Sequence, residues 1–358
     1  MLPALGAAGT TGETTEEFDL RPTWEALAQD PGFLGLKPEP ERAAVVAFYT
    51  QADPVPPAAV PLPAGWTLET VGSAAWSPAS LSFPETGVQD LHESGGDGLP
   101  PTPEMAEGLG PGTKLLISVP EEPGIVALCT ANFLWQDKDG RLYLGTAGHC
   151  LLPKGKVATH GYRADYDASK VRVRACYTLC AMGGESGFIV QGYLVDLGPV
   201  AYARQTGPGG DLGNDFGIVR IPTSLHSAAR AQVPVWGGPH GMGYFPGDLL
   251  DLDREVLHYG NGKGWGETPA SRARVGFAVI AMGINWQAAM LASAGDSGSP
   301  VLSGKVDTDG DVLRGEDALG ILTHALEPAG GLGGGTTIQQ ARGMAREAGI
   351  TLTLVEAS

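Results

Sequence analysis

The amino-acid sequence predicts an all-β protein. Glycine and proline account for 54 and 28 of its 358 residues, and both favour turns over long helices. Short apolar or alternating runs follow one another from Lys114 onwards, which is typical of β-strands. Hydrophobic residues make up 42% of the chain, enough for a globular core.

Residues 1–110 differ from the remainder of the chain. Proline and glycine are concentrated at 54–63 and 95–111, with acidic residues interspersed, and such a composition indicates a linker or a loosely structured region. Two short helices are expected within this N-terminal extension, at 24–29 and 41–49.

The strands expected from Lys114 onwards fall into two groups, separated by a crossing segment. The turn Asp137-Lys138-Asp139-Gly140 joins two strands of the first group and brings the chain towards His149. The first group comprises 115–119, 125–130, 131–136, 142–144, 171–174, 187–195 and 216–221. The second comprises 248–252, 256–259, 275–284, 299–302 and 318–323. A helix at 338–348, ended by Gly349, and a short strand at 350–354 close the chain.

Three segments carry residues suited to nucleophilic catalysis, in the order His149, Asp215, Ser297. A serine hydroxyl is a weak nucleophile at neutral pH, so it needs an imidazole to accept its proton. The imidazole needs a carboxylate on its other nitrogen, which holds one tautomer and stabilises the charged ring. Gly295 and Gly298 flank the serine and let backbone N–H groups point into one small concavity, where an oxyanion could be stabilised.

These segments resemble those of the chymotrypsin-like (trypsin-fold) serine proteases of bacterial type. The resemblance rests on Thr-Ala-Gly-His-Cys around His149, on Asn-Asp-Phe-Gly-Ile-Val around Asp215 and on Gly-Asp-Ser-Gly-Ser-Pro around Ser297. It implies that His149 is the general base, Asp215 its orienting acid and Ser297 the nucleophile, with the N–H groups of Gly295 and Ser297 forming the oxyanion hole. Ser299 stands where animal trypsins usually carry glycine.

The same resemblance implies two six-stranded antiparallel β-barrels followed by a C-terminal helix. The protease domain would then span residues 111–358. Its first barrel is expected at about 111–222, its second at about 223–335 and its helix at about 336–349. Residues 1–110 would then form an N-terminal extension. One interpretation is a propeptide that assists folding or blocks the site, and the other is a tail without an inhibitory role.

Two other aspartates are alternatives for the acid that orients His149. The spacing between His149 and Asp215 is longer than usual in the family, so Asp196 and Asp211 remain candidates. Asp215 is preferred because it opens the apolar strand at 216–221, whose end would hold the carboxylate against packed surface.

The four cysteines suggest an oxidising environment. By the resemblance, Cys129 and Cys150 form the disulfide that flanks the catalytic histidine. Cys176 and Cys180 form either a second bridge with a small loop, or a free or metal-binding pair. An even cysteine count favours a compartment in which disulfides persist.

Substrate preference depends on the primary specificity pocket. The resemblance places Leu291, six positions before the nucleophile, at the pocket floor, and Thr323 and His324 on its wall. Without a carboxylate at position 291, cleavage after arginine or lysine is disfavoured. An uncharged or apolar preference is expected first, and a preference for acidic side chains through His324 is the alternative.

Net charge, apolar stretches and the first residues of the chain indicate which partners and which location to expect. A formal charge of −17 argues against nucleic acid, which is bound through clustered Lys and Arg. No stretch approaches about 18 consecutive apolar residues, so no membrane anchor is expected. The first fifteen residues show no basic start or apolar core of a secretory signal, yet the cysteines and the resemblance favour a secreted or extracytoplasmic protein.

The sequence thus predicts a serine endopeptidase that acts on polypeptides through an acyl-enzyme, without a cofactor or metal. The alternative is a catalytically silent binding or scaffold protein that keeps the protease fold. The oligomeric state is left open.

Overall fold

Strands dominate the fold. The computed structural model describes residues 20–91, 108–153, 168–183, 189–206, 212–245, 255–263, 268–281, 283–306, 313–327 and 331–358. Their strands lie in sheets of three, five, six and eight strands, and the longest helix has 10 residues. The predicted all-β class and its two-barrel architecture are confirmed, while the strand expected at 248–252 lies outside the described residues.

The second barrel closes on itself. Its strands run in the order β20-β19-β16-β17-β18-β21, and β21 pairs again with β20, so six antiparallel strands form a ring without free edges. Two further strands also pair with β20, β15 at residues 317–318 and β4 at residues 324–327. The eight strands are β4 (Ala75–Pro78), β15 (Gly241–Met242), β16 (Glu255–Tyr259), β17 (Ala273–Ala281), β18 (Asn285–Ala289), β19 (Pro300–Val306), β20 (Leu313–Glu327) and β21 (Gly333–Thr337).

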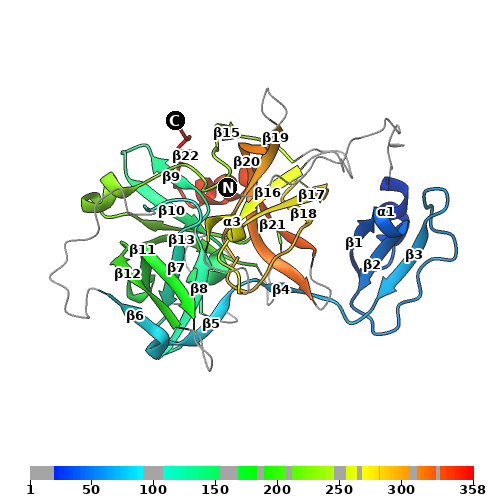
Figure 1. Cartoon of the computed structure of the whole chain (residues 1–358), viewed down its shortest axis with the longest axis horizontal. Helices are drawn as coiled ribbons and strands as arrows, with labels where there is room; N and C mark the ends of the chain where they lie inside the picture. Colours follow the sequence, from blue (N-terminus) through cyan, green and yellow to red (C-terminus); the bar gives the residue numbers. More distant parts are fainter. Residues whose placement is uncertain are drawn as a thin grey trace, which may run out of the picture.

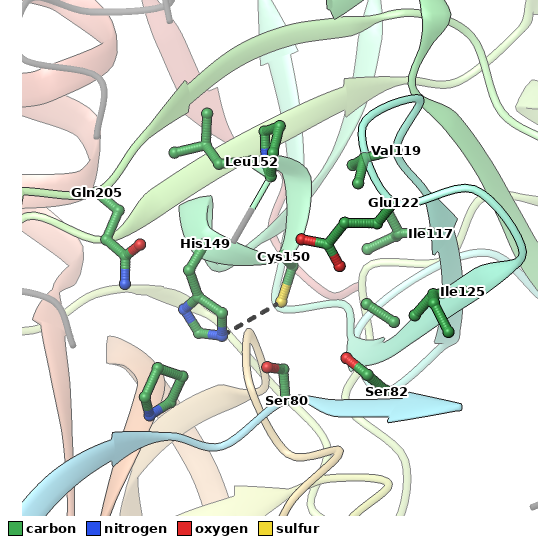
Figure 2. A pocket seen from close by; sticks show the side chains of 13 residues that line it. Ser80, Ser82, Ile117, Val119, Glu122, Ile125, His149, Cys150, Leu152 and Gln205 are labelled. Carbon is green, nitrogen blue, oxygen red and sulfur yellow. Dashed lines mark hydrogen bonds between the residues drawn. The ribbon is translucent and has the colours of Figure 1, made fainter. Parts of the chain in front are cut away.

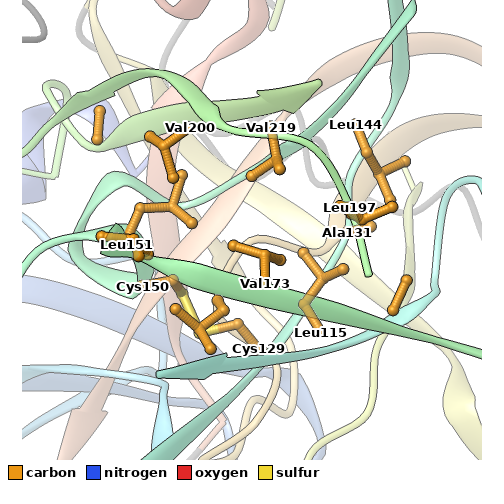
Figure 3. Close-up of a cluster of buried hydrophobic side chains, with 14 of the residues drawn as sticks. Leu115, Cys129, Ala131, Leu144, Cys150, Leu151, Val173, Leu197, Val200 and Val219 are labelled. Atoms are coloured by element: carbon orange, nitrogen blue, oxygen red, sulfur yellow. A yellow bond between two sulfur atoms is a disulfide. The ribbon is translucent and has the colours of Figure 1, made fainter. Parts of the chain in front are cut away.

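The first barrel is built from two sheets around a common core. One sheet has the order β5-β8-β7-β11-β12-β6 and the other β13-β14-β10-β9-β22. Figure 3 shows apolar side chains of both sheets meeting between them, beside the Cys129–Cys150 disulfide. The strands are β5 (Leu81–Pro84), β6 (Val88–Asp90), β7 (Lys114–Ser118), β8 (Ile125–Thr130), β9 (Leu134–Asp137), β10 (Leu142–Thr146), β11 (Arg172–Gly183), β12 (Ile189–Asp196), β13 (Val200–Arg204), β14 (Phe216–Arg220) and β22 (Leu352–Leu354).

One expected strand of this barrel begins later than its apolar run. The sequence predicts a strand over 131–136, whereas β9 begins at Leu134. The Asn132 carboxamide oxygen accepts a hydrogen bond from the Phe133 N–H at 2.7 Å. A side chain that bonds to the adjacent backbone competes with strand pairing, which accounts for the delayed start.

Helices are few and short. The longest, α4 (Ile338–Glu347), confirms the C-terminal helix; the Thr337 hydroxyl caps its start, and Gly349 ends it with φ of 83°. The other helical segments are α1 (Arg21–Leu27), α2 (Gly148–Leu151), α3 (Pro269–Arg272), η1 (Pro40–Arg42), η2 (Glu85–Gly87), η3 (Ala168–Lys170) and η4 (Thr223–Ala228).

The N-terminal extension holds more regular structure than its composition indicates. Helix α1 precedes a sheet of β1 (Phe33–Glu39), β2 (Ala44–Tyr49) and β3 (Thr67–Val71), in the order β1-β2-β3. The helix expected at 41–49 is wrong: strand β2 occupies most of it. All six residues of β2 are buried and pair with β1 on one side and β3 on the other, so tertiary pairing overrides the local helical signal.

This small sheet packs against the second barrel. Leu36 of β1 and Val45 of β2 share a buried cluster with Val279 of β17 and Leu326 of β20. In Figure 1 the sheet lies on the side of the second barrel away from the first, and the chain then runs back through β4 towards the first barrel. There β5 pairs with β8 and β6 with β12, so the extension contributes strands to both barrels.

We expect the two disulfides to differ in their contribution to stability. Cys129 and Cys150 are 21 positions apart, whereas Cys176 and Cys180 are 4 apart. Loop entropy then predicts a loss of about 3 kcal/mol when Cys129 and Cys150 are both changed to Ala, and about 2 kcal/mol for the other pair. Urea unfolding of both double variants tests this, and a larger loss for the Cys176–Cys180 pair would contradict it.

Candidate active site

His149 lies in the single turn α2, directly after β10. This turn packs against β13 and β14 so closely that a Cβ on Gly148 would collide with the carbonyl groups of Arg204 and Phe216. The glycine before His149 is therefore a requirement of packing. It allows the imidazole to sit at the boundary between the two barrels.

The Asp215 carboxylate holds His149 through two hydrogen bonds. The His149 backbone N–H donates to Oδ1 at 2.9 Å, and the ring Nδ1 lies 2.6 Å from Oδ2. Because a carboxylate only accepts, Nδ1 carries the proton, and Nε2 of the neutral ring is left as the basic nitrogen. Of the two alternatives, Asp196 has a half-exposed side chain paired with Arg172, and Asp211 lies outside the described residues.

Asp215 is fixed from the second barrel. Its backbone N–H donates to the Thr336 hydroxyl of β21 at 3.1 Å, and that hydroxyl lies 3.0 Å from the carbonyl oxygens of both Leu212 and Asp215. Burial alone would raise the pKa of Asp215, but the charge and hydrogen bonds of His149, assisted by His324, lower it below its usual value. The carboxylate is therefore ionised at neutral pH while wholly enclosed.

Ser297 is fully buried, and its hydroxyl donates to the Thr323 carbonyl at 3.0 Å. No hydrogen bond joins this hydroxyl to His149 in the described part of the chain. The two residues nevertheless contact the same sulfur: Cys150 Sγ lies 3.7 Å from His149 Nε2 and 4.0 Å from the Ser297 carbonyl oxygen. The imidazole thus lies beside the loop that carries the serine.

Two backbone N–H groups of that loop converge on one oxygen. Gly295 N and Ser297 N donate to the carbonyl of Ala79 at 2.6 and 3.0 Å. The loop adopts this shape with positive φ at Gly295 and Gly298, of 108° and 92°. A Cβ at Gly298 would also collide with the Thr130 carbonyl, so both glycines of the motif are needed.

Thr130 at the end of β8 attaches this loop to the first barrel. Its N–H donates to the Ser297 carbonyl at 2.7 Å, and its hydroxyl donates to the Gly295 carbonyl at 2.8 Å. The same hydroxyl accepts from the N–H of Asn261 at 3.1 Å. Strand pairing of the first barrel therefore sets the position of a loop that belongs to the second.

A buried ion pair supports the loop from the other side. The Asp296 carboxylate is enclosed and faces Arg274 Nη2 of β17 at 2.8 Å, while accepting N–H groups of Gly262 and Ser293. Burial lowers the pKa of Arg274 below its usual value, and the carboxylate counteracts that effect. This pair orients the peptide unit just before Ser297.

His258 of β16 contacts Ser299, two positions after Ser297. Ser299 Oγ donates to the Asp296 carbonyl at 2.6 Å and also contacts His258 Nε2. Because the hydroxyl proton is used on Asp296, the ring must donate from Nε2. Burial, with a contribution from Arg274, holds the pKa of His258 well below its ordinary value, so the ring is neutral.

A cavity of about 450 Å³ opens beside His149. Figure 2 shows Ser80 near the imidazole, and Glu122 and Gln205 also line the cavity. Much of the lining comes from apolar side chains of the first barrel, such as Ile117.

The expected specificity residues separate in space. Leu291 is 53% exposed and lines another pocket, of about 460 Å³, together with Lys37 and Gly331. Thr323 lies beside Ser297. His324 is fully buried, with Nδ1 2.8 Å from the Thr323 hydroxyl oxygen and 3.9 Å from an Asp215 oxygen, so it faces the acid.

The cysteines are all paired, as Cys129–Cys150 and Cys176–Cys180. The first pair brings two sulfurs within 4.8 Å of a His149 ring nitrogen, but sulfurs bonded to each other are not thiolate ligands for a metal. Two disulfides are consistent with an oxidising, extracytoplasmic compartment. None of the helices in the described segments has the length and apolar character needed to cross a bilayer.

Several supporting residues were not predicted from the sequence. Thr130, Thr336, Arg274 and His258 carry no local motif. The one available signal was Ser299, whose hydroxyl in a buried loop requires a partner. Ala79 lies in the N-terminal extension. A propeptide that blocks the site is one of the two interpretations of this extension, but no motif marks Ala79 as the residue that contacts the loop of Ser297.

The chain is similar to several bacterial proteases of known structure. Thermobifida fusca protease A is 16% identical, with 69% of this chain and 99% of that one covered at a TM-score of 0.38. The Nocardiopsis protease is 14% identical, covering 68% and 98% at 0.39. Cellulomonas bogoriensis chymotrypsin is 16% identical, covering 69% and 99% at 0.35.

No family model matches the chain, and no curated protein does. TM-scores between 0.35 and 0.39 carry no argument about chemistry, so the function is argued below from the site itself.

Removal of the Arg274 guanidinium should destabilise the loop that carries Ser297. We expect Arg274→Met to cost about 3 kcal/mol, because it leaves the Asp296 carboxylate buried without the cation that faces it. Arg172→Met is the matched control, since its pair with Asp196 is half exposed and is worth under about 1 kcal/mol. Urea unfolding measures both, and equal losses would contradict the role of the buried pair.

His258 should make stability depend on pH. Its pKa is near 6.5 in the unfolded chain and far lower in the folded one, so below about pH 6.5 only the unfolded state takes up the proton. Stability therefore falls on acidification, by up to about 1.4 kcal/mol per pH unit from this group. Unfolding free energies at about pH 7.5 and 5.5 should show a smaller decrease for His258→Gln than for the wild type, and identical decreases would contradict the assignment.

Proposed function

We propose that the protein is a serine endopeptidase, with Ser297 as nucleophile, His149 as general base and acid, and Asp215 as its orienting acid. The N–H groups of Gly295 and Ser297 serve as the oxyanion hole. In this mechanism the hydroxyl attacks a peptide carbonyl, the amine leaves with a proton from His149, and water hydrolyses the acyl-enzyme. The reaction needs no cofactor.

One observation carries the proposal. Gly295 N and Ser297 N already donate to a single carbonyl oxygen, beside the Ser297 side chain. Two fixed donors on one carbonyl oxygen are what acyl transfer requires, because negative charge develops on that atom in the transition state. A loop with only a structural role would have no need to direct both N–H groups at a peptide carbonyl.

The His149–Asp215 pair supports the same assignment. The carboxylate fixes the tautomer that leaves Nε2 basic, and its lowered pKa keeps it charged when the ring takes up a proton. The chemical step needs a change of the Ser297 χ1 rotamer, from the Thr323 carbonyl towards His149.

The wider assignments follow from this function. Polypeptides are the proposed substrates, and the two disulfides support secretion or an extracytoplasmic location. We place the protease unit at residues 111–358 and the extension at 1–110, with β5 and β6 of the extension completing a sheet of the first barrel.

The second candidate function is a silent protease-fold binding or scaffold protein. The orientation of the Ser297 hydroxyl, which donates to Thr323 and not to His149, favours it. A silent protein would retain the Asp215–His149 pair as structure alone. Hydrolysis measured on matched variants separates the two candidates.

Ser297→Ala should abolish hydrolysis of a mixed peptide library, read by mass spectrometry after prolonged incubation. Asp215→Asn should lower turnover by about 10⁴-fold, because the amide presents the wrong hydrogen-bonding pattern to Nδ1. Asp196→Asn is the matched control and should retain wild-type turnover, since Asp196 pairs with Arg172 at the surface. Circular dichroism would confirm folding of each variant.

Loss of activity in Asp196→Asn with normal turnover in Asp215→Asn would refute the acid assignment. A folded wild type that cleaves no peptide in the library would favour the scaffold.

A further inference from the structure

A segment of the N-terminal extension lies across the proposed active site as a bound peptide would. Strand β4 pairs antiparallel with the end of β20, with Pro78 opposite His324 and Trp76 opposite Leu326. The next residue, Ala79, donates its N–H to the Thr323 carbonyl at 3.0 Å. Addition of an extended strand to a sheet edge is a general mode of peptide recognition.

The peptide bond after Ala79 meets the proposed catalytic groups. Its carbonyl oxygen accepts the N–H groups of Gly295 and Ser297, so it occupies the position that the oxyanion would take. The Thr323 carbonyl accepts both the Ala79 N–H and the Ser297 hydroxyl, each at 3.0 Å. The nucleophile and the Ala79 peptide unit therefore meet at one backbone atom.

The chain beyond Ala79 passes the general base. Ser80 lines the cavity next to His149, as Figure 2 shows, and Leu81 begins β5, which pairs with β8 of the first barrel. The segment thus enters along the second barrel, presents one carbonyl to the N–H pair and leaves along the first barrel. A substrate cleaved between Ala79 and Ser80 would follow the same path.

We propose that the Ala79–Ser80 bond is the first substrate of this site, cleaved within the same chain. This rests on the proposed function. Ser297 Oγ, once rotated towards His149, bonds to the Ala79 carbonyl carbon and passes its proton to His149. The C–N bond breaks as His149 protonates the Ser80 nitrogen. Water then attacks the acyl-enzyme, gives one proton to His149 and leaves a carboxylic acid on Ala79, while Ser297 regains its proton.

The environment of Ala79 defines the class of substrate. Ala79 is only 2% exposed, so the protein already encloses the residue at the position before the scissile bond. A charged side chain there would have to be buried, and a bulky one would displace packed atoms. The site therefore accepts small uncharged residues at this position, preceded by an extended segment.

The same contacts block the proposed active site of the uncut chain. The extension upstream of the bond is anchored by β4 and by the cluster that Leu36 shares with Leu326, and the downstream part is anchored by β5 and β6. Cleavage breaks the covalent link between these anchors. Both new ends stay bound until β4 separates from β20, so access for other polypeptides follows cleavage and release.

The test is the intact mass of the purified full-length chain over time, with the wild type and Ser297→Ala in parallel. We expect the wild type to yield fragments 1–79 and 80–358, at a rate independent of protein concentration because the bond is held in its own cleft. Ser297→Ala should stay intact. Ala79→Asp should prevent cleavage at this bond, whereas Ala59→Asp, at an exposed position of the same extension, should still be cleaved.

A second readout separates this proposal from the proposed function. Hydrolysis of acetyl-Trp-Ser-Pro-Ala-p-nitroanilide, which copies residues 76–79, is measured for the wild type and for Ala79→Asp, whose charged side chain should expel the segment from the cleft. We expect hydrolysis by both, without a lag in the variant, and at least tenfold less of the analogue ending in Glu.

A wild-type chain that stays uncut at 79–80 but hydrolyses the peptide would overturn the self-cleavage and leave the protease standing. Fragments that form equally in Ser297→Ala would also overturn it. If neither the wild type nor Ala79→Asp hydrolyses any peptide and the chain stays intact, the proposed function fails as well.

Discussion

The site depends on one buried charge, the Asp215 carboxylate. An ion enclosed in protein is stable only when hydrogen bonds and opposite charge replace its lost hydration. The backbone N–H and the ring of His149 supply these on one side, and Thr336 of the second barrel fixes the Asp215 backbone on the other. The contacts of this carboxylate and its backbone therefore join the two barrels. They also fix the imidazole so that Nε2 faces the loop that carries Ser297.

The loop that carries Ser297 is also held by partners for its buried polar groups. Its positive-φ glycines turn two N–H groups outwards, and that backbone shape persists because Thr130 holds one side while the Asp296–Arg274 pair holds the other. The donors are thus preorganised before any substrate arrives. The chain's own Ala79 carbonyl meets this need in the uncut protein, which links the fold of the extension directly to the chemistry of the site.

The sequence was informative where function depends on short contiguous motifs. The all-β class and the C-terminal helix are predictable because glycine-rich turns, strand periodicity and helix ends are local signals. The pairing of His149 with Asp215 follows only from the family resemblance that their motifs carry. Residues 41–49 were wrongly predicted as a helix because β2 is stabilised by neighbours on both sides that its own sequence does not reveal. The contact of Ala79 with Ser297 joins residues more than two hundred positions apart, and no local pattern encodes such a pairing.

The central claim, that His149 activates Ser297, is tested most directly by covalent labelling with a fluorophosphonate. The reagent reacts irreversibly, so it accumulates on Ser297 whenever the blocking segment leaves the cleft, even if that opening is brief. Mass spectrometry of the digested protein should find the label on Ser297 in the wild type and none in His149→Ala. A folded wild type without label, or equal labelling of both proteins, would contradict the account.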